Sequence, residues 1–517
     1  MSDELHKLES QRRSNRDAAT GLAQHPYGRR TDGILSTIAA KSLFSKEAND
    51  DFNASSKQPG YTDPRPQATV AGRIMLSRDN GKLIWFQLRD ADGDLQVAVS
   101  QRDCAAPGFD LAKLTDLGDV IIASGRVMMT KTGETTLWAN SVAPAAKCLV
   151  PPPEKHSGLQ DVELRYRQRY VDMWANPETL SVLKLRSRIV SRIREFLSSR
   201  DYLEVETPML QTLAGGAAAR PFVTHMNALD ISLFMRIAPE LYLKRLLVGG
   251  MRRVFEINRN FRNEGLDKQH NPEFTMLEAY HAYGDVQTVM ELTESAIRDA
   301  ATLVRDLTQP GTAGDVILPF GDLSINYSRP FSRVTYGELF AKAYGFDMSD
   351  IPKARATLKG MRPNLAAAID AMDGILVINE LFEEKGEAQL DHSVPTFITD
   401  YPAAISPLTR PKTDNPVLAD RADLFIAGME IAPHYTELND PDVQESKFRE
   451  QLKGLDAEKS AEENTFRTFD HDFIRALKVG MPPAGGMGLG IDRLVMLLTN
   501  QRTIRDVVLF PMMRPEE

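Results

Sequence analysis

The N-terminal third of the chain contains short runs in which apolar and polar positions alternate, the pattern of β-strands that bury one face. Five such runs are ATVAGRIML, LIWFQLRD, LQVAVS, DVIIASGRVMM and TLWANSVAP, and a helical pattern, FDLAKLTDL, lies between the third and the fourth. Three strands, a helix and two strands is the order of the OB fold, a β-barrel that binds oligonucleotides on its strand face. The pattern therefore predicts an OB barrel in residues 61–150.

The second run carries a candidate contact for nucleic acid. Trp85 and Gln87 occupy alternate positions, so they are expected to share one face of the strand. An indole there can stack an unpaired base, and the amide can read the edge of that base. The alternative is that Trp85 belongs to the ordinary core of the barrel.

Residues 253–280 consist of two apolar segments joined by a polar loop, 263–272, which predicts an antiparallel hairpin. Arginine suits a phosphate or a carboxylate, a Phe ring can hold a flat base, and a buried carboxylate beside a Tyr hydroxyl can hold an amine. The hairpin is therefore interpreted as a nucleotide and amine site, with a salt-bridged surface hairpin as the alternative. The side chains at mostly even spacing that carry this interpretation are Arg262, Glu264, His270, Phe274, Glu278 and Tyr280.

FRNEG followed by HNPEF resembles the second signature of the class II aminoacyl-tRNA synthetases. A helical pattern at 181–202 leading into YLEVETPML, with Pro208, resembles the first signature, which forms the dimer interface in that family. AGGMGLGIDRLVML, with Arg493, resembles the third. The resemblance implies an α+β chain: an OB barrel followed by a catalytic domain with an antiparallel sheet flanked by helices, assembled as a homodimer.

From roughly residue 60 to the C-terminus the chain is similar to the bacterial lysyl-tRNA synthetases, in TPMLQTLAGGAAARPF, MRIAPELYLKRLLVGG, YTELNDP and TIRDVVLFPMMRP. Synthetases for aspartate and asparagine share that fold, and the charge of the amino-acid pocket separates them. Glu278, Tyr280 and Glu437 match the three donors of an ammonium group. The resemblance implies ATP-dependent activation of L-lysine to lysyl-adenylate and transfer of the lysyl group to the 3′ end of tRNA(Lys).

The resemblance also assigns roles to individual residues. Those expected to bind ATP are Arg262, Glu264, His270, Asn271, Phe274, Glu430 and Arg493, of which Arg262, His270 and Arg493 are expected to be catalytic. Those expected to bind lysine are Gly216, Glu240, Arg262, Glu278, Tyr280, Tyr435, Glu437 and Gly488. Asp423 and Glu430 would hold the Mg²⁺ bound with ATP. Arg73, Trp85, Gln87 and Glu134 would contact the anticodon.

Two positions depart from the family pattern near this chemistry. Pro433 stands where the family commonly has Asn, so a side-chain amide and a backbone N–H are both missing. His434 is the expected substitute donor. Asp423 stands where bacterial enzymes carry Glu and is one methylene shorter, but either carboxylate can hold magnesium.

At 517 residues the chain exceeds a single core. The proline-rich VPPPEKHSGLQ marks a boundary. We expect an N-terminal extension, partly helical, at 1–60, the OB domain at 61–150, a linker at 151–165 and the catalytic domain at 166–517. Basic residues of the extension either contact tRNA backbone or form a solvated helix face: Arg12, Arg13, Arg16, Arg29 and Arg30.

The net charge of −9 does not exclude a nucleic-acid partner, because electrostatic attraction depends on local patches. Only two cysteines occur, which fits a reducing compartment, and no apolar run approaches the ~18 residues of a membrane span. The expected location is the cytoplasm, with no membrane contact. Two further hypotheses remain: a lysine-activating paralogue with a non-tRNA acceptor, and a catalytically silent tRNA-binding relative.

Overall fold

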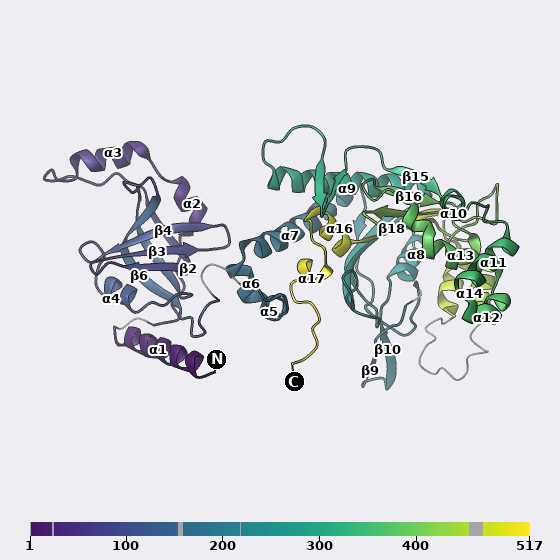
Figure 1. Ribbon diagram of the computed structural model, residues 1–517, viewed down its shortest axis with the longest axis horizontal. Coiled ribbons are helices and arrows are strands. Elements are labelled where there is room, and N and C mark those ends of the chain that lie inside the picture. Colours follow the sequence, from purple (N-terminus) through teal and green to yellow (C-terminus); the bar gives the residue numbers. More distant parts are fainter. Residues whose placement is uncertain (1, 23–24, 154–158, 218, 454–468, 517) are drawn as a thin grey trace. The chain divides into compact units, whose positions relative to one another are not determined.

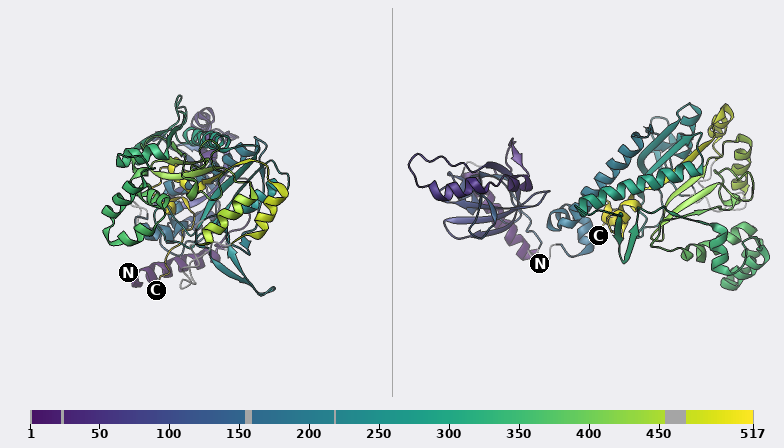
Figure 2. Two further views of the ribbon diagram at one scale, coloured as in Figure 1. Left: turned by 90° about the vertical axis from the view of Figure 1, so that its right-hand side faces the viewer. Right: turned by 90° about the horizontal axis from the view of Figure 1, so that it is seen from above.

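The computed structural model describes residues 2–22, 25–153, 159–217, 219–453 and 469–516 (Figures 1 and 2). The chain forms two compact units, Met1–Leu180 and Ser181–Glu517. Part of the linker expected at 151–165, residues 154–158, lies outside the described residues.

The first unit contains a closed barrel, because β2 pairs with both β3 and β5 while β4, β6 and β5 complete the ring. Side chains alternate along β3, so that Ile84, Phe86 and Leu88 lie in the barrel core. The observed order confirms the predicted OB fold. Its elements are β2 (Gln67–Asp79), β3 (Leu83–Arg89), β4 (Asp94–Ser100), α4 (Gly108–Lys113), β5 (Val120–Met129) and β6 (Thr135–Ala146), with β1 (Ile34–Leu35) paired to β2.

Helices precede and follow the barrel within this unit. Arg12 of the first helix is only 8% exposed and donates to the backbone oxygens of Leu117 at 2.9 Å and Cys148 at 2.8 Å. It therefore holds its helix to the barrel, and the expectation that Arg12 contacts tRNA or lies on a solvated face is wrong. The helices are α1 (Ser2–Gly21), α2 (Thr37–Ser42), α3 (Lys46–Ser55), α5 (Val162–Arg167) and α6 (Arg169–Ala175).

The second unit is built on an eight-stranded sheet in the order β15-β16-β17-β18-β19-β12-β11-β7. The pairings are antiparallel except at the two edges, where β7 runs parallel to β11 and β15 parallel to β16. The antiparallel sheet confirms the expected α+β fold. The strands are β7 (Leu203–Glu204), β11 (Arg253–Phe261), β12 (Glu273–Ala282), β15 (Ser332–Thr335), β16 (Thr396–Thr399), β17 (Arg421–Ile426), β18 (Met429–Thr436) and β19 (Ala484–Gly490).

Helices cover both faces of this sheet. Helices α7 (Pro177–Ser198), α9 (Val286–Thr308) and α16 (Ile491–Leu498) share one core with Leu277 and Ala279 of β12. Helices α8 (Glu240–Val248) and α15 (His471–Gly480) share another with Tyr280 and Ala282. The alternation along β12 therefore directs Glu278 and Tyr280 to the face that carries α8.

Smaller elements complete the second unit. A helical group, α10 (Tyr336–Tyr344), α11 (Ile351–Met361), η1 (Pro363–Leu365), α12 (Ala366–Ala371), α13 (Gly374–Leu381), η2 (Phe382–Gly386) and η3 (Glu387–Gln389), precedes β16. The others are β8 (Leu210–Gln211), β9 (Val223–Met226), β10 (Ile231–Met235), β13 (Ile317–Phe320), β14 (Leu323–Asn326), η4 (Ala403–Ile405), α14 (Pro441–Lys453) and α17 (Ile504–Val507).

The hairpin predicted at 253–280 is confirmed, with Val254 opposite Tyr280 and Asn260 opposite Phe274. It lies inside the sheet, between β7 and β19, so the surface-hairpin alternative is wrong. In YLEVETPML the chain forms short strands on either side of Pro208, which has no N–H to donate to a sheet: β7 lies before the proline and β8 begins after it.

Candidate active site

Neighbouring strands β12, β19 and β18 place glycine backbone beside reactive side chains. Glu278 lies opposite Gly488, while Tyr280 and Tyr435 lie on the two sides of Gly486. A Cβ on Gly486 would lie 1.9 Å from a carboxylate oxygen of Glu437, and one on Gly488 would lie 2.4 Å from the methyl group of Met276. At Gly486 a side chain would also overlap the Tyr280 ring, so glycine there leaves room for a pocket above the backbone of β19.

Three buried carboxylates meet in this pocket. Glu240 begins α8, Glu278 belongs to β12, and Glu437 follows β18; their exposed fractions are 7%, 5% and 0%. Tyr280 donates its hydroxyl proton to Glu278 Oε2 at 3.0 Å. The Glu240 Cβ lies 3.3 Å from the Cβ that Gly216 lacks, and Gly216 has a φ of +85° that favours glycine. The structure thus brings these predicted lysine-binding residues together.

Lys244 is a member of this cluster that the sequence analysis missed. It is fully buried, its Nζ lies 2.6 Å from Glu240 Oε1, and it also forms an ion pair with Glu437 Oε2. Burial disfavours its charge, but the two carboxylates outweigh burial and raise the pKa of Lys244. The Glu240–Lys244 spacing of one helical turn was the available signal, while the pairing with Glu437 depends on the fold.

Glu278 forms no ion pair with a Lys or Arg among the described residues, although the charge of Arg236 acts on it. Burial, reinforced by the negative charge of Glu240, raises its pKa to about 8. Burial also raises the pKa of Glu437, and Lys244 opposes that shift. A cation that enters the pocket beside Glu278 would lower the pKa of this carboxyl and thereby ionise it.

A cavity of about 280 Å³ opens next to the pocket, at the loop end of the hairpin. Pro433 and Met276 also line it. All seven residues expected to bind ATP line this one cavity: Arg262, Glu264, His270, Asn271, Phe274, Glu430 and Arg493.

Arg262 lies in this cavity with its guanidinium 5.1 Å from the Phe274 ring centre. Its Nε is buried and has no hydrogen-bond partner among the described residues. Burial lowers the pKa of Arg262, while Glu264 and Glu278 partly offset that effect. A buried guanidinium with an unpaired donor is costly unless an anion joins it, which indicates a phosphate or carboxylate site.

His270 is oriented from both sides. Its Nδ1 lies 2.8 Å from Asp267 Oδ2, and its Nε2 lies 3.0 Å from an Arg493 guanidinium nitrogen. Nδ1–H therefore donates to Asp267 and Nε2 accepts from Arg493. Arg493 also donates to the backbone oxygen of Glu430 at 2.7 Å, so these groups form one rim of the cavity.

The two carboxylates expected to hold magnesium lie on β17 and β18. Asp423 is 2% exposed and accepts from Arg421 through both oxygens, at 3.1 Å and 2.6 Å. Glu430 keeps exposed surface at the cavity, and desolvation by the groups around it, followed by the charge of Asp423, raises its pKa. Glu387 was missed by the sequence analysis: burial, then the charges of Glu430, Glu383 and Asp423, raise its pKa to about 7.

Comparison with known proteins agrees with this geometry. Residues 161–514 match the family model of class II tRNA synthetases (D, K and N), and residues 68–145 match an OB-fold nucleic acid binding domain. The lysine–tRNA ligase of Carboxydothermus hydrogenoformans is 47% identical over 87% of this chain and 89% of its own length. That of Magnetococcus marinus is 44% identical over 96% and 94%, and that of Escherichia coli 45% over 87% and 86%.

The chain belongs to the lysine–tRNA ligase family of class II tRNA synthetases. The family resemblance seen in the sequence is thereby confirmed. Among the described residues, no helix combines the length and apolar character needed to cross a membrane.

His434 is not the substitute donor that was expected in place of the Asn missing at position 433. His434 points away from the pocket: it is fully buried, with its ring nitrogens 3.1 Å from Ala422 O and 2.8 Å from Thr293 Oγ1. Burial lowers its pKa to about 4. His434 therefore cannot replace the Asn that the family carries at position 433, because strand alternation sends residues 433 and 434 to opposite faces.

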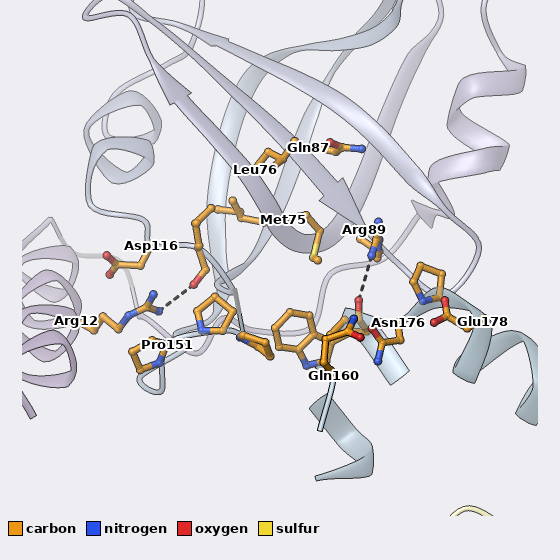
Figure 3. Close-up of a pocket in the computed structure, with 17 residues that line it drawn as sticks. Arg12, Met75, Leu76, Gln87, Arg89, Asp116, Pro151, Gln160, Asn176 and Glu178 are labelled. Carbon is orange, nitrogen blue, oxygen red and sulfur yellow. Dashed lines mark hydrogen bonds between the residues drawn. The ribbon is translucent and has the colours of Figure 1, made fainter. Parts of the chain in front are cut away.

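The residues expected at the anticodon lie in the first unit. Trp85 alternates with the core residues Ile84 and Phe86, so it lies on the outer face and the barrel-core alternative is wrong. Gln87, two positions along, donates to Asp94 at 2.9 Å. It also lines a cavity of about 780 Å³, in which Arg89 donates to the backbone oxygen of Trp174 at 3.2 Å (Figure 3).

The other two anticodon candidates are placed differently. Arg73 donates to the backbone oxygen of Gly118 at 2.6 Å, and its guanidinium lies 4.8 Å from the Trp174 ring centre. Glu134 is exposed in the turn between β5 and β6, and its Oε1 lies 3.8 Å from Lys41 Nζ. Trp85 and Gln87 thus share one face, whereas Arg73 already has partners within its own unit.

Proposed function

We propose that the enzyme activates L-lysine with ATP and transfers the lysyl group to the 3′ end of tRNA(Lys). The observation that carries this proposal is the buried acidic pocket beside Arg262, whose buried Nε has no hydrogen-bond partner among the described residues. An amino acid with a cationic side chain fits the carboxylates of that pocket, and an aspartate side chain would meet like charges. The family membership of the chain supports the same reaction.

Lysine would bind with its α-amino group at Glu240 and Gly216 and its carboxylate at Arg262. Glu278, Tyr280 and Glu437 would receive the ε-ammonium group, with Tyr435 and Gly488 lining the pocket. Tyr280 then donates to an ionised Glu278, so that the carboxylate and the phenol oxygen both face the ammonium group.

ATP would lie in the adjoining cavity. Phe274 would stack the adenine and Glu264 would accept from its amino group, with Asn271 beside them. Arg262 would bind the α-phosphate, and His270 and Arg493 would bind the outer phosphates. The carboxylates of Asp423 and Glu430 have the hard oxygen donors that Mg²⁺ prefers, and the bound ion would neutralise phosphate charge.

In the first step an oxygen of the lysine carboxylate attacks the α-phosphorus, and the bond to the bridging oxygen breaks to release pyrophosphate. In the second, a ribose hydroxyl of the tRNA 3′ end attacks the acyl carbon and AMP leaves. Neither step needs a protein nucleophile. Arg262 contributes by holding the two anions together and neutralising the charge that builds up between them.

The OB barrel would bind the anticodon through Trp85, Gln87, Arg73 and Glu134. We assign residues 61–150 to this domain, 1–60 to an N-terminal extension, 151–165 to a linker and 166–517 to the catalytic domain. The strands of the barrel, which lie within Gln67–Ala146, support this division. The reaction needs tRNA, lysine and ATP together, so we place the enzyme in the cytoplasm.

The active form would be a homodimer. Large apolar side chains on β8, β9 and the preceding segment are exposed, with Leu210 at 52% and Val223 at 60%. Single exposed apolar residues are ordinary, but several on one small sheet indicate a contact surface. Leu210→Arg should shift the mass measured by light scattering to that of a monomer, whereas Val479→Arg on α15, at a side chain that is 76% exposed, should not. A dimer that survives Leu210→Arg places the interface elsewhere.

The test of function is lysine-dependent exchange of pyrophosphate into ATP. We expect exchange with lysine and its loss in Glu437→Gln, which removes a pocket charge at constant volume. Glu291→Gln, on the exposed surface of α9, is the matched control. Exchange without transfer to tRNA would favour the paralogue that uses another acceptor, and absence of exchange at high lysine and magnesium would favour the silent relative.

A further inference from the structure

Trp138 lies beside Trp85 on the outer face of the OB barrel. On β6 its neighbours Leu137 and Ala139 are buried in the core, whereas Trp138 is only half-buried. Backbone pairing sets Trp85 opposite Ala98 and Ala98 opposite Trp138. Residues paired in register point to the same side of a sheet, so the two indoles stand in one row across three strands.

The two rings are in contact. Their centres are 6.4 Å apart and their planes meet at 82°, the edge-to-face arrangement that aromatic pairs favour. Ala98 between them is fully buried even though it points to the outer face. A small residue at this position lets the indoles approach, and they in turn cover it.

A hydrogen bond to Asp103 also fixes the Trp138 ring. Its Nε1–H donates to Asp103 Oδ2 at 3.1 Å. Arg102 donates to both oxygens of Asp103, at 2.8 Å and 3.1 Å, and this contact lowers the pKa of Asp103. The carboxylate that orients Trp138 is therefore charged at neutral pH, which strengthens the hydrogen bond.

We propose that Trp138 is a positioning residue for anticodon recognition, which holds the Trp85 ring in the orientation that stacks an unpaired base. The inference rests on the proposed role of Trp85 as the stacking residue. An aromatic side chain on an exposed strand face can turn about its side-chain bonds, and binding must then restrict it. A ring already fixed by an aromatic neighbour avoids that cost when RNA binds.

The experiment is a double-mutant cycle in aminoacylation of tRNA(Lys), with Trp85→Ala, Trp138→Ala and the double variant. Base stacking on a ring is worth about tenfold or more in affinity. We expect Trp85→Ala to raise the KM for tRNA roughly tenfold and Trp138→Ala roughly fivefold. The kcat and the rate of pyrophosphate exchange should not change.

The interaction between the two positions decides the inference. If Trp138 acts through Trp85, adding Trp138→Ala to Trp85→Ala raises the KM for tRNA no further. Fully additive effects would mean that Trp138 contacts RNA by itself, which overturns the positioning role. Trp138→Phe keeps an aromatic edge and should recover most of the affinity, whereas an unfolded barrel would not be rescued in this way.

Two outcomes separate this inference from the function on which it rests. A tRNA KM that is unchanged in Trp85→Ala overturns the stacking role of Trp85 and the inference with it. A raised KM in Trp85→Ala with no change in Trp138→Ala overturns the inference alone. Asn140→Ala, an exposed position on β6, is the control and should leave the KM unchanged.

Discussion

Lys244 and Glu437 form an ion pair with no exposed surface on either side chain, although one comes from helix α8 and the other from the end of β18. The same ammonium group contacts Glu240, so one internal cation serves two of the three pocket carboxylates. Glu278 forms no ion pair of this kind in the part of the chain that the structure describes, and it accepts a hydrogen bond from Tyr280. The pocket can therefore hold several carboxylates in a small volume, because Lys244 offsets part of their negative charge.

Lys244→Met should raise the KM for lysine at least tenfold, because Glu240 and Glu437 would lose their shared cation and tend to become protonated. Breaking a buried pair from one side costs about 3–5 kcal/mol, so the melting temperature should fall as well. Pyrophosphate exchange and thermal unfolding measure the two effects. Lys478→Met, which breaks a partly exposed pair with Glu445, is the control and should leave the melting temperature nearly unchanged, because exposed ion pairs contribute little to stability. An unchanged KM in Lys244→Met would contradict this role.

Lysine binding should depend on pH through Glu278. The carboxyl is mostly protonated below its pKa of about 8, and the ammonium group binds its ionised form. The KM for lysine should therefore fall as the pH rises from about 6 to about 8, since the substrate amine stays charged up to about pH 10. A KM that is flat over this range would show that Glu278 is already ionised in the free enzyme.

The same group should affect the stability of the unliganded enzyme in the opposite sense. The folded pKa of about 8 exceeds the ordinary value of 4.5, so between them the folded state binds more protons than the unfolded state. The contribution of Glu278 to the free energy of unfolding is fully present below pH 4.5 and is lost as the pH rises towards 8. Between pH 6 and pH 8 the melting temperature of Glu278→Gln should fall less than that of the wild type. The melting temperature of Glu291→Gln should fall as much as that of the wild type. A steeper decline in Glu278→Gln would contradict the assignment.

Pro433→Asn should lower the KM for lysine. Pro433 lines the cavity next to Arg262, and His434 is bound on the opposite face of the strand. One restored hydrogen bond is worth about 0.5–1.5 kcal/mol, or roughly twofold to tenfold in KM. Pyrophosphate exchange at varied lysine concentration measures the change. If the KM is unaltered, another group already anchors the substrate at this point.

Asp423→Glu should reduce the magnesium concentration needed for half-maximal exchange. The Glu side chain is one methylene longer, whereas the carboxylate of Asp423 is held by two nitrogens of Arg421. Asp423→Asn should raise that concentration, because it removes the charge and keeps the size. If neither variant changes the magnesium requirement, Asp423 does not hold the ion.

Much of the site could be predicted from local pattern. Alternation along 253–280 correctly predicted a hairpin with Glu278 and Tyr280 on one side, and alternation along the second barrel strand correctly set Trp85 and Gln87 on one face. Both predictions need only the two-residue period of a strand. Local pattern did not predict the division of residues 202–210 into the short strands β7 and β8. Pro208 lies between them and has no N–H to donate to a sheet.

The sequence by itself determined the order of the elements, the family and the residue types that meet the substrates, because these follow from short-range periodicity and from motifs. The tertiary structure alone decided which groups share a space. Lys244 meets Glu437, and Trp138 meets Trp85, across strands and helices distant in the chain. His434 faces the core for the same reason: the sheet presents one side of β18 to the pocket and buries the other against α9. Long-range packing sets these partners, and no local pattern encodes them.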